Sequence, residues 1–166
     1  MNSLSNQQLK MVTQFTSWRF IFFLIWKLPM GFVAGLRVKS LDNHQSIVTV
    51  PYNYLNKNPF NSMYFAVQAM AAELSTGALT FLHLNNRNIS VIVTNVESHF
   101  YKKVVTKTKF ICVDGDSIAS ALKIAQETNE AQKCVMISKG YDMNGVCVSK
   151  FQITWSLKKR KQLNNN

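Results

Sequence analysis

One stretch of this chain constrains its fold more than any other, because Glu73 is the only Asp, Glu, Lys or Arg between Lys57 and Arg87. The segment around it, residues 58–79, is long enough for a helix but apolar on every side, which indicates a buried helix. Its helical neighbours, three and four positions away, include no cation. A carboxylate in such surroundings is costly unless it is paired or protonated, so Glu73 is a candidate for chemistry. The alternatives are an ion pair with another element and solvation at a helix edge.

The composition fits one globular domain with an anionic partner. A chain of 166 residues with 47% hydrophobic residues can bury a sizeable core and is not disordered. Its formal net charge of +11 favours nucleic acid, an acidic membrane or a phosphate-rich small molecule, although solubility alone also explains such a charge. The aromatic residues of the predicted strands are not interleaved with cations, so nucleic acid is the least favoured of these partners.

The cysteines and histidines suggest neither a disulfide framework nor a metal site. Cys112, Cys134 and Cys147 are odd in number and form no CxxC pair, and the three histidines are scattered. Each cysteine falls in a strand-like run, where a free thiol usually acts as a small core residue. These features favour a reducing compartment, so we expect a cytoplasmic protein with no metal.

The N-terminal segment predicts an amphipathic helix over residues 7–28 that ends before Pro29. Its apolar run, residues 20–26, is too short to span a membrane, which takes about 20 apolar residues. No small-residue cleavage site follows, so a signal peptide is not indicated either. We expect this helix to pack over the domain, and contact with a membrane surface is the less favoured alternative.

The rest of the chain predicts an α+β domain in which a mostly antiparallel sheet covers one long helix. Segments with the pattern of strands cover residues 32–40, 45–55, 89–101, 104–113, 131–140 and 146–157, the last two forming a hairpin around Asn144-Gly145. The long helix begins with Asn58 as N-cap and Pro59 as first residue, or is capped by Asn61 or Ser62.

A second, short helix is expected after Asp116, its predicted cap. The expected organisation is an amphipathic helix over residues 1–30, the main domain over 31–158 and a basic, polar tail over 159–166. One sheet cannot cover an all-round apolar helix, so a second protomer is a reasonable cover.

In residues 58–66 and 71–77 the sequence resembles proteins with the hotdog fold, in which a sheet wraps a long central helix. The sequence is similar to acyl-CoA thioesterases of the phenylacetic-acid-pathway type, and within them to the DUF4442 group, over roughly residues 32–158. That branch has an Asn in the loop before the helix, His-Gly-Gly at its start and an acid about nine residues after the His. The resemblance implies Glu73 as the acid and Asn58 or Asn61 as the loop residue. Tyr64-Phe65-Ala66 replaces His-Gly-Gly, which narrows the space for an acyl group.

The function implied is hydrolysis of acyl-CoA or a related thioester by a homodimer or tetramer, with no cofactor beyond the coenzyme A of the substrate. Backbone N–H groups from Ser62 to Phe65, including that of Tyr64, would bind the developing oxyanion. Glu73 would act as general base or as nucleophile. Ser75 and Thr76 could orient water, although small helical residues more often serve packing.

Basic residues near the third and fourth predicted strands could hold the phosphates of coenzyme A; they are Arg87, Lys102, Lys103, Lys107 and Lys109. The alternative is a solvated basic edge that discourages strand aggregation. The main functional alternative is a non-catalytic hotdog protein that binds acyl-CoA or an acyl chain. A further alternative is a basic protein associated with a membrane or with nucleic acid.

Overall fold

A single antiparallel sheet forms the body of the protein. The computed structural model describes residues 4–84, 88–128 and 130–160. The strand order is β1-β2-β4-β5-β6-β3, and the strands are β1 (Arg37–Leu41), β2 (Ser46–Val50), β3 (Ile89–Phe100), β4 (Thr108–Cys112), β5 (Gln132–Tyr141) and β6 (Cys147–Lys159). Every neighbouring pair is antiparallel. The predicted hairpin is confirmed, with Gly145 at positive φ in its turn.

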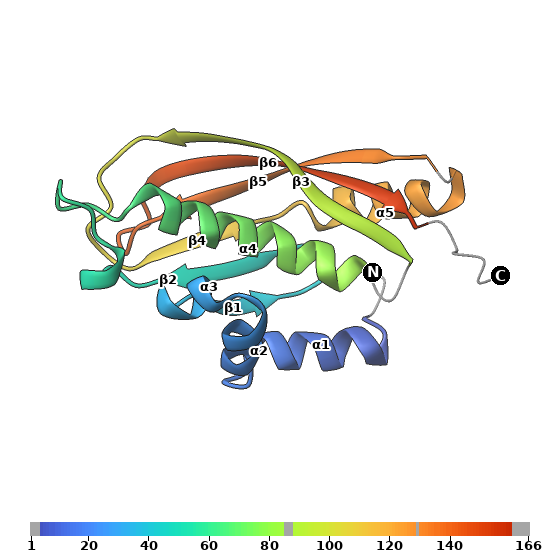
Figure 1. Ribbon diagram of the computed structural model, residues 1–166, viewed down its shortest axis with the longest axis horizontal. Helices are drawn as coiled ribbons and strands as arrows, with labels where there is room; N and C mark the ends of the chain where they lie inside the picture. The colour runs from blue at the N-terminus through green and yellow to red at the C-terminus, as the bar shows by residue number, and fades with distance from the viewer. Residues whose placement is uncertain (1–3, 85–87, 129, 161–166) are drawn as a thin grey trace.

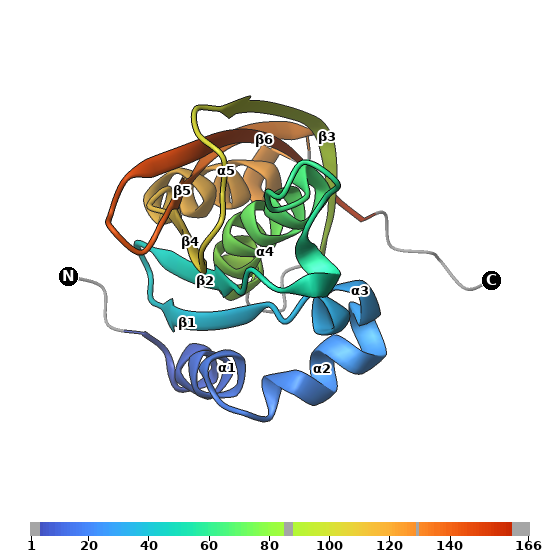
Figure 2. The same ribbon diagram turned by 90° about the vertical axis from the view of Figure 1, so that its left-hand side faces the viewer.

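The long helix α4 (Phe65–Leu84) lies in the concave face of this sheet (Figure 1), and a view along it shows the strands curving around it (Figure 2). By length and composition α4 could cross a membrane, yet most of it is buried in the domain, as in the core helix of a soluble protein. The shorter helix α5 (Gly115–Thr128) packs on the same face beside the end of α4. The predicted α+β architecture of a wrapped helix is therefore confirmed.

Three of the predicted strands are shorter than expected, for local reasons. Residues 29–33 form the short helix α3 (Pro29–Val33), and Gly35 at φ 73° turns the chain into β1. Pro51 follows β2 and has no N–H for the ladder, and the 3₁₀ turn η1 (Tyr54–Asn56) comes next. Before β4, Val104 bonds to the loop that precedes α4 instead of extending the sheet.

The start of the long helix differs from the prediction. Asn58 and Asn61 are wrong as N-caps, as is Ser62, because α4 begins at Phe65. The Asn58 carboxamide accepts hydrogen bonds from the N–H groups of Phe60 and Ser62, which stabilises a loop in place of a helical turn. Asn61 has φ 55°, a left-handed conformation that a right-handed helix does not contain.

The cap predicted for the second helix is also wrong. Asp116 lies inside the first turn of α5, which begins at Gly115. The residue before the helix, Asp114, bonds instead to β5, because its carboxylate accepts the Ile137 N–H at 2.6 Å. The three cysteines lie in β4, β5 and β6 as free thiols, and burial raises the pKa of Cys112 to about 12.

The N-terminal segment forms α1 (Asn6–Thr16) and α2 (Phe20–Lys27), so the single helix predicted over residues 7–28 is wrong. A capping box between Ser5 and Gln8 starts α1. The break follows Thr16, where the Ser17 hydroxyl bonds to a backbone carbonyl. Pro29 does not simply end a helix, because it is the first residue of α3. Phe15, Phe20 and Leu24 are buried, so the inner side of these helices covers the domain as expected.

Candidate functional site

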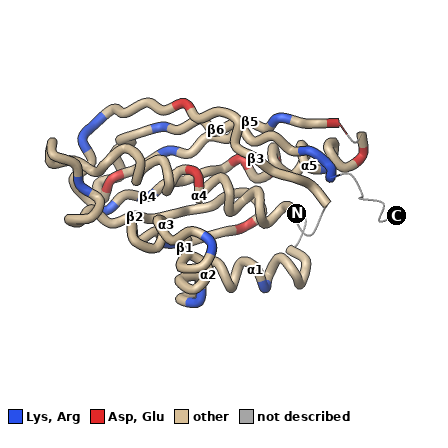
Figure 3. Tube along the Cα trace, viewed as in Figure 1, with Lys and Arg blue, Asp and Glu red and all other residues tan. Residues whose placement is uncertain are grey.

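Glu73 lies on the one stripe of α4 that the sheet leaves partly open. Figure 3 shows an acidic position partway along α4, and the acidic residue in the sequence of this helix is Glu73. Its side chain lines a pocket of about 210 Å³ between α4, the N-terminal helices and the β3–β6 side of the sheet. Apart from Thr80, the remaining walls are apolar and include Phe15, Phe23, Leu28, Gly77, Val91 and Trp155. An acidic group therefore stands in a mainly apolar hollow.

The carboxylate has no compensating partner in the part of the chain that the structure describes. Within residues 4–84, 88–128 and 130–160 it forms neither an ion pair nor a side-chain hydrogen bond. Burial disfavours its charged form and raises the pKa of Glu73 above the ordinary value of 4.5. A carboxylate shifted in this direction is a stronger base near neutral pH than an exposed one. The ion-pair alternative for Glu73 thus has no support among the described residues.

Gly77, one turn after Glu73, keeps space open beside the carboxylate. A Cβ at this position would lie 3.7 Å from Glu73 Oε1 and 3.6 Å from the Trp155 ring. With glycine, that volume belongs to the pocket. The Trp155 ring is fixed in turn, because its Nε1–H donates to Thr76 Oγ1 at 3.1 Å.

Ser75 and Thr76 are next to Glu73 in sequence but are bonded into the core. The Ser75 hydroxyl lies 2.8 Å from that of Ser138 on β5 and donates to the Ala72 carbonyl. Thr76 donates to the Glu73 carbonyl and accepts from Trp155. Both side chains are fully buried, and neither lines the Glu73 pocket. The structure therefore does not bring these hydroxyls together with the carboxylate.

At the helix start, most of the predicted donors are already engaged. The N–H groups of Ser62, Met63 and Tyr64 donate to the Asn58 side chain, the Val104 carbonyl and the Asn56 carbonyl, respectively. In the described part of the chain, the Phe65 and Ala66 N–H groups have no acceptor. These two first-turn amides are the available donors, at the positive end of the helix dipole.

A second hollow, of about 340 Å³, lies at this helix start, and Asn58, Ser62, Phe65, Lys102 and Lys103 contribute to it. It shares no lining residue with the Glu73 pocket. Tyr64 and Phe65 present half-exposed rings in edge-to-face contact at 4.9 Å. The structure thus brings Asn58, the helix start at Phe65 and two lysines together in a hollow that does not include the carboxylate.

The predicted phosphate-binding set is divided between places in the fold. Lys102 and Lys103 lie at the helix start, where Lys103 Nζ donates to the Phe60 carbonyl at 3.4 Å. Lys107 is exposed in the loop before β4. Lys109 lies on the outer face of the sheet, because its neighbours in β4, Thr108 and Phe110, face the core. Arg87 lies outside the described residues.

Sequence reasoning missed Gln68, which lines the hollow at the helix start. Its Nε2 donates to the Met63 carbonyl at 3.3 Å, and its buried Oε1 has no hydrogen-bond partner among the described residues. As a rare polar residue in the apolar helix, it could have been noticed. Sequence reasoning also missed Phe23 and Leu28 as walls of the Glu73 pocket, because no local pattern reveals such a contact. The described residues bring no three potential metal-ligating side chains together.

Comparison with protein-family models finds no match for this chain, and comparison with curated protein sequences finds none either. Solved structures match over most of their length. A Pseudomonas aeruginosa protein of unknown function, described as a probable thioesterase, has a TM-score of 0.72 at 20% identity, covering 86% of this chain and 95% of its own. A Chlorobaculum tepidum protein of unknown function has a TM-score of 0.74 at 18% identity, covering 86% and 93%.

A Haemophilus influenzae thioesterase matches with a TM-score of 0.61 at 10% identity, covering 84% of this chain and 90% of its own. These identities are low, so the similarity speaks for architecture alone. Together with the long helix wrapped by a six-stranded antiparallel sheet, it shows that the chain has the hotdog fold.

Proposed function

We propose that the protein is a thioesterase that hydrolyses acyl-CoA or a related thioester. The observation that carries the proposal is the Glu73 carboxylate, desolvated by burial and without a partner among the described residues, in an apolar pocket on the open stripe of the central helix. Proteins with the same fold that are described as thioesterases support the reaction class. We further propose a cytoplasmic enzyme of the phenylacetic-acid-pathway type, related to the DUF4442 group.

The chemistry requires a base or nucleophile and an oxyanion hole. Glu73, with its raised pKa, would take a proton from water or attack the thioester carbonyl directly. The Phe65 and Ala66 N–H groups would bind the oxygen on which negative charge develops, and such donors are often worth about 3–4 kcal/mol in acyl transfer. The thiolate of coenzyme A then leaves, which gives the free acid directly when water attacks, or an anhydride of the acyl group with Glu73, hydrolysed by water in a second step, when Glu73 attacks. No cofactor takes part in this scheme.

One protomer would not hold both groups against one substrate. Glu73 follows Phe65 by eight residues, which corresponds to about 12 Å along a helix, whereas each group must approach the reacting carbonyl to about 3 Å. We therefore propose a homodimer, or a tetramer built from it, in which one copy's Glu73 lies beside the other's helix start. The edge strand β3, exposed over residues 94–100, is available for pairing with a second copy.

For the phosphates of coenzyme A, the favoured ligands are Lys102 and Lys103, because they stand at the same hollow as the free helix amides. Lys107 stays a candidate in the neighbouring loop, while Lys109, on the outer face of the sheet, would contribute only at longer range.

A non-catalytic protein that binds acyl-CoA or an acyl chain is the second candidate. It is favoured by the aromatic side chains of Tyr64 and Phe65, which occupy space at the helix start where an acyl thioester would have to lie. In that case the apolar Glu73 pocket would hold the chain without reaction.

The test is release of free thiol from short, medium, long and aromatic acyl-CoAs, with the Glu73→Gln variant as the matched control. A thioesterase hydrolyses at least one class, and the variant loses that activity while it still binds the substrate. Binding without thiol release by the natural sequence, across all classes, would establish the second candidate. Equal turnover by the folded variant would remove Glu73 from the mechanism.

A further inference from the structure

The outer side of the N-terminal helices is apolar and uncovered. Trp18 is 68% exposed and Trp26 is 83% exposed, and Phe22 and Ile25 are exposed between them. Phe22, Ile25 and Trp26 lie on one face of α2, opposite the buried Phe20 and Leu24, and Trp18 lies in the turn just before this helix. The Trp18 and Phe22 rings pack edge-to-face at 5.7 Å. Such a contiguous aromatic surface marks an interaction site more often than a solvent-facing one.

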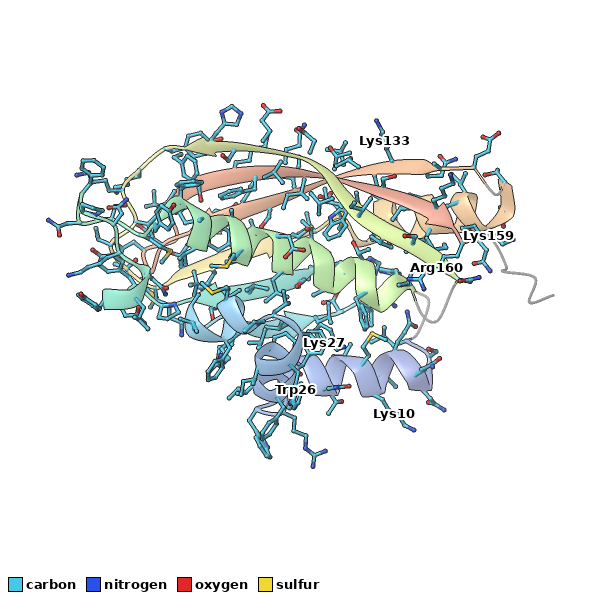
Figure 4. The ribbon with its side chains drawn as sticks, in the orientation of Figure 1. Lys10, Trp26, Lys27, Lys133, Lys159 and Arg160 are labelled. Carbon is cyan, nitrogen blue, oxygen red and sulfur yellow. The ribbon has the colours of Figure 1, made fainter. Side chains whose placement is uncertain are left out.

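The charged residues of the same N-terminal segment are all basic. Residues 1–41 contain five Lys or Arg and no Asp or Glu. Lys10, Arg19 and Lys27 form no ion pair with any residue that the structure describes. Lys10 and Arg19 line a groove of about 730 Å³ beside Trp18, along α1 and the turn that follows it. Figure 4 shows Lys10 directed away from the domain and Trp26 and Lys27 on the adjoining helix.

We propose that this face, defined by Trp18, Arg19, Phe22, Ile25, Trp26 and the neighbouring Lys10 and Lys27, docks the protein on the surface of an anionic phospholipid bilayer. Tryptophan prefers the boundary between headgroups and acyl chains, where its apolar ring and polar N–H are both accommodated. A basic amphipathic helix that lies in this boundary gains from apolar burial and from attraction to anionic lipid. The chain would lie on the membrane and not cross it.

Charge favours a bilayer over a second copy of this chain as the occupant. Two copies meeting through this face would bring Arg19, Lys10 and Lys27 of each against cations of the other, with no acid in the segment to neutralise them. An anionic bilayer supplies the opposite charge and a wide apolar layer at once. Because Phe23 and Leu28 belong to the same segment and line the Glu73 pocket, docking would also bring that pocket close to the lipid.

The test uses the full chain with vesicles of phosphatidylcholine, alone or mixed with about one third phosphatidylglycerol. Sedimentation measures binding, and tryptophan fluorescence reports on its site. Of the three tryptophans, Trp155 is buried at 7% exposure, so a blue shift on vesicle addition comes from Trp18 and Trp26. We expect binding to the anionic vesicles, a blue shift, and weakening of both by salt.

Matched variants locate the surface. Trp18→Ser/Trp26→Ser should lower vesicle affinity by at least about tenfold, and Arg19→Gln or Lys27→Gln by about fivefold each. The control is Lys133→Gln, an exposed cation on the opposite side of the molecule (Figure 4), which should change affinity little. All these positions are exposed, so thermal unfolding should match the natural sequence.

Three results would overturn the proposal. The first is no sedimentation with the anionic vesicles. The second is an equal loss from Lys133→Gln and Arg19→Gln, which would assign the binding to net charge. The third is a change of oligomeric state on Trp18→Ser/Trp26→Ser, which would assign the face to a second copy. The Glu73→Gln variant should bind vesicles normally, so this outcome is independent of the proposed thioesterase activity.

Discussion

Ser75 and Thr76, on the side of α4 toward the sheet, and Glu73, on its open stripe, have opposite hydrogen-bonding environments. On the side toward the sheet, the Ser75 and Thr76 hydroxyls are fully buried and each has a specific partner, Ser138 or Trp155. On the open stripe, Glu73 is partly buried and has no partner among the described residues. Satisfied buried groups stabilise and specify a fold, whereas an unsatisfied charge is kept at a cost in stability. The difference separates residues that hold the helix in place from the residue available for chemistry.

The largest effect is expected at Glu73, where the difference between the open stripe and the buried side of α4 can be tested directly. The Glu73→Gln change keeps the size of the side chain and removes the base, so thioester turnover should fall by at least about a hundredfold. The fold should persist, because no described partner is lost. Thiol-release kinetics normalised to folded protein measure the effect, and an undiminished rate would show that the open stripe is not the catalytic one.

The second prediction concerns the free amides at the helix start. Phe65→Pro removes one N–H at the first helical position, where proline is tolerated, and should lower turnover by about a hundredfold. Phe65→Ala, which also loses the ring but keeps the N–H, is the matched control and should retain most activity.

Dimers mixed from a Phe65→Pro chain and a Glu73→Gln chain then test whether a site is shared. One of the two sites would combine an intact helix start with an intact carboxylate, so activity should return to about half that of the natural dimer. Verified mixed dimers without activity would indicate that both groups come from one chain.

On the satisfied side, Ser75→Ala should act on stability alone. It leaves the buried Ser138 hydroxyl without its described partner, which should lower the free energy of unfolding by about 1–3 kcal/mol. Ser75→Ala/Ser138→Ala should lose less than the sum of the single changes, because no orphan hydroxyl is left. Denaturant titration measures both. A large drop in turnover per folded molecule would instead give Ser75 a place in the chemistry.

Gly77 borders both the Glu73 carboxylate on the open stripe and the buried Trp155 ring. Gly77→Ala should raise the free energy of unfolding by about 0.5–1 kcal/mol, because alanine favours a helix and its methyl group would meet Trp155 at ordinary contact distance. The same methyl group would fill space beside Glu73 Oε1, so turnover should fall. Stability measured together with kinetics separates these effects, and a gain in both would mean that the space next to the carboxylate is not used by substrate.

The smallest expected effect is a pH dependence of stability. Because burial raises the pKa of Glu73 in the folded protein, the folded state holds this proton more tightly than the unfolded chain. The contribution of Glu73 to stability is therefore present below its ordinary pKa of 4.5 and is lost as pH rises through the raised value. The Glu73→Gln variant should therefore be more stable than the natural sequence across that pH window and equally stable below it. Thermal unfolding across pH measures this difference, and a gap of the opposite sign would indicate a stabilising partner for the carboxylate.

The sequence by itself determined the main architecture and the candidate acid. Apolar residues on every side of α4 required a cover, and alternation with turn residues placed β3, β5 and β6 almost to their observed ends. The lone charge at Glu73 was visible without any structure. These features follow from local periodicity and from the cost of burying a charge, both of which can be read from the sequence.

Local bonds of Asn58 loosen the chain before α4, but tertiary structure fixed where the helix begins, because Val104, distant in sequence, accepts the Met63 N–H and holds that loop out of the helix. It also decided that Ser75 points at Ser138, that Lys109 faces away from Lys102 and Lys103, and that Phe23 reaches the Glu73 pocket. Each of these depends on contacts between residues distant in sequence. No local pattern encodes such contacts, because they exist only after the sheet has closed around the helix.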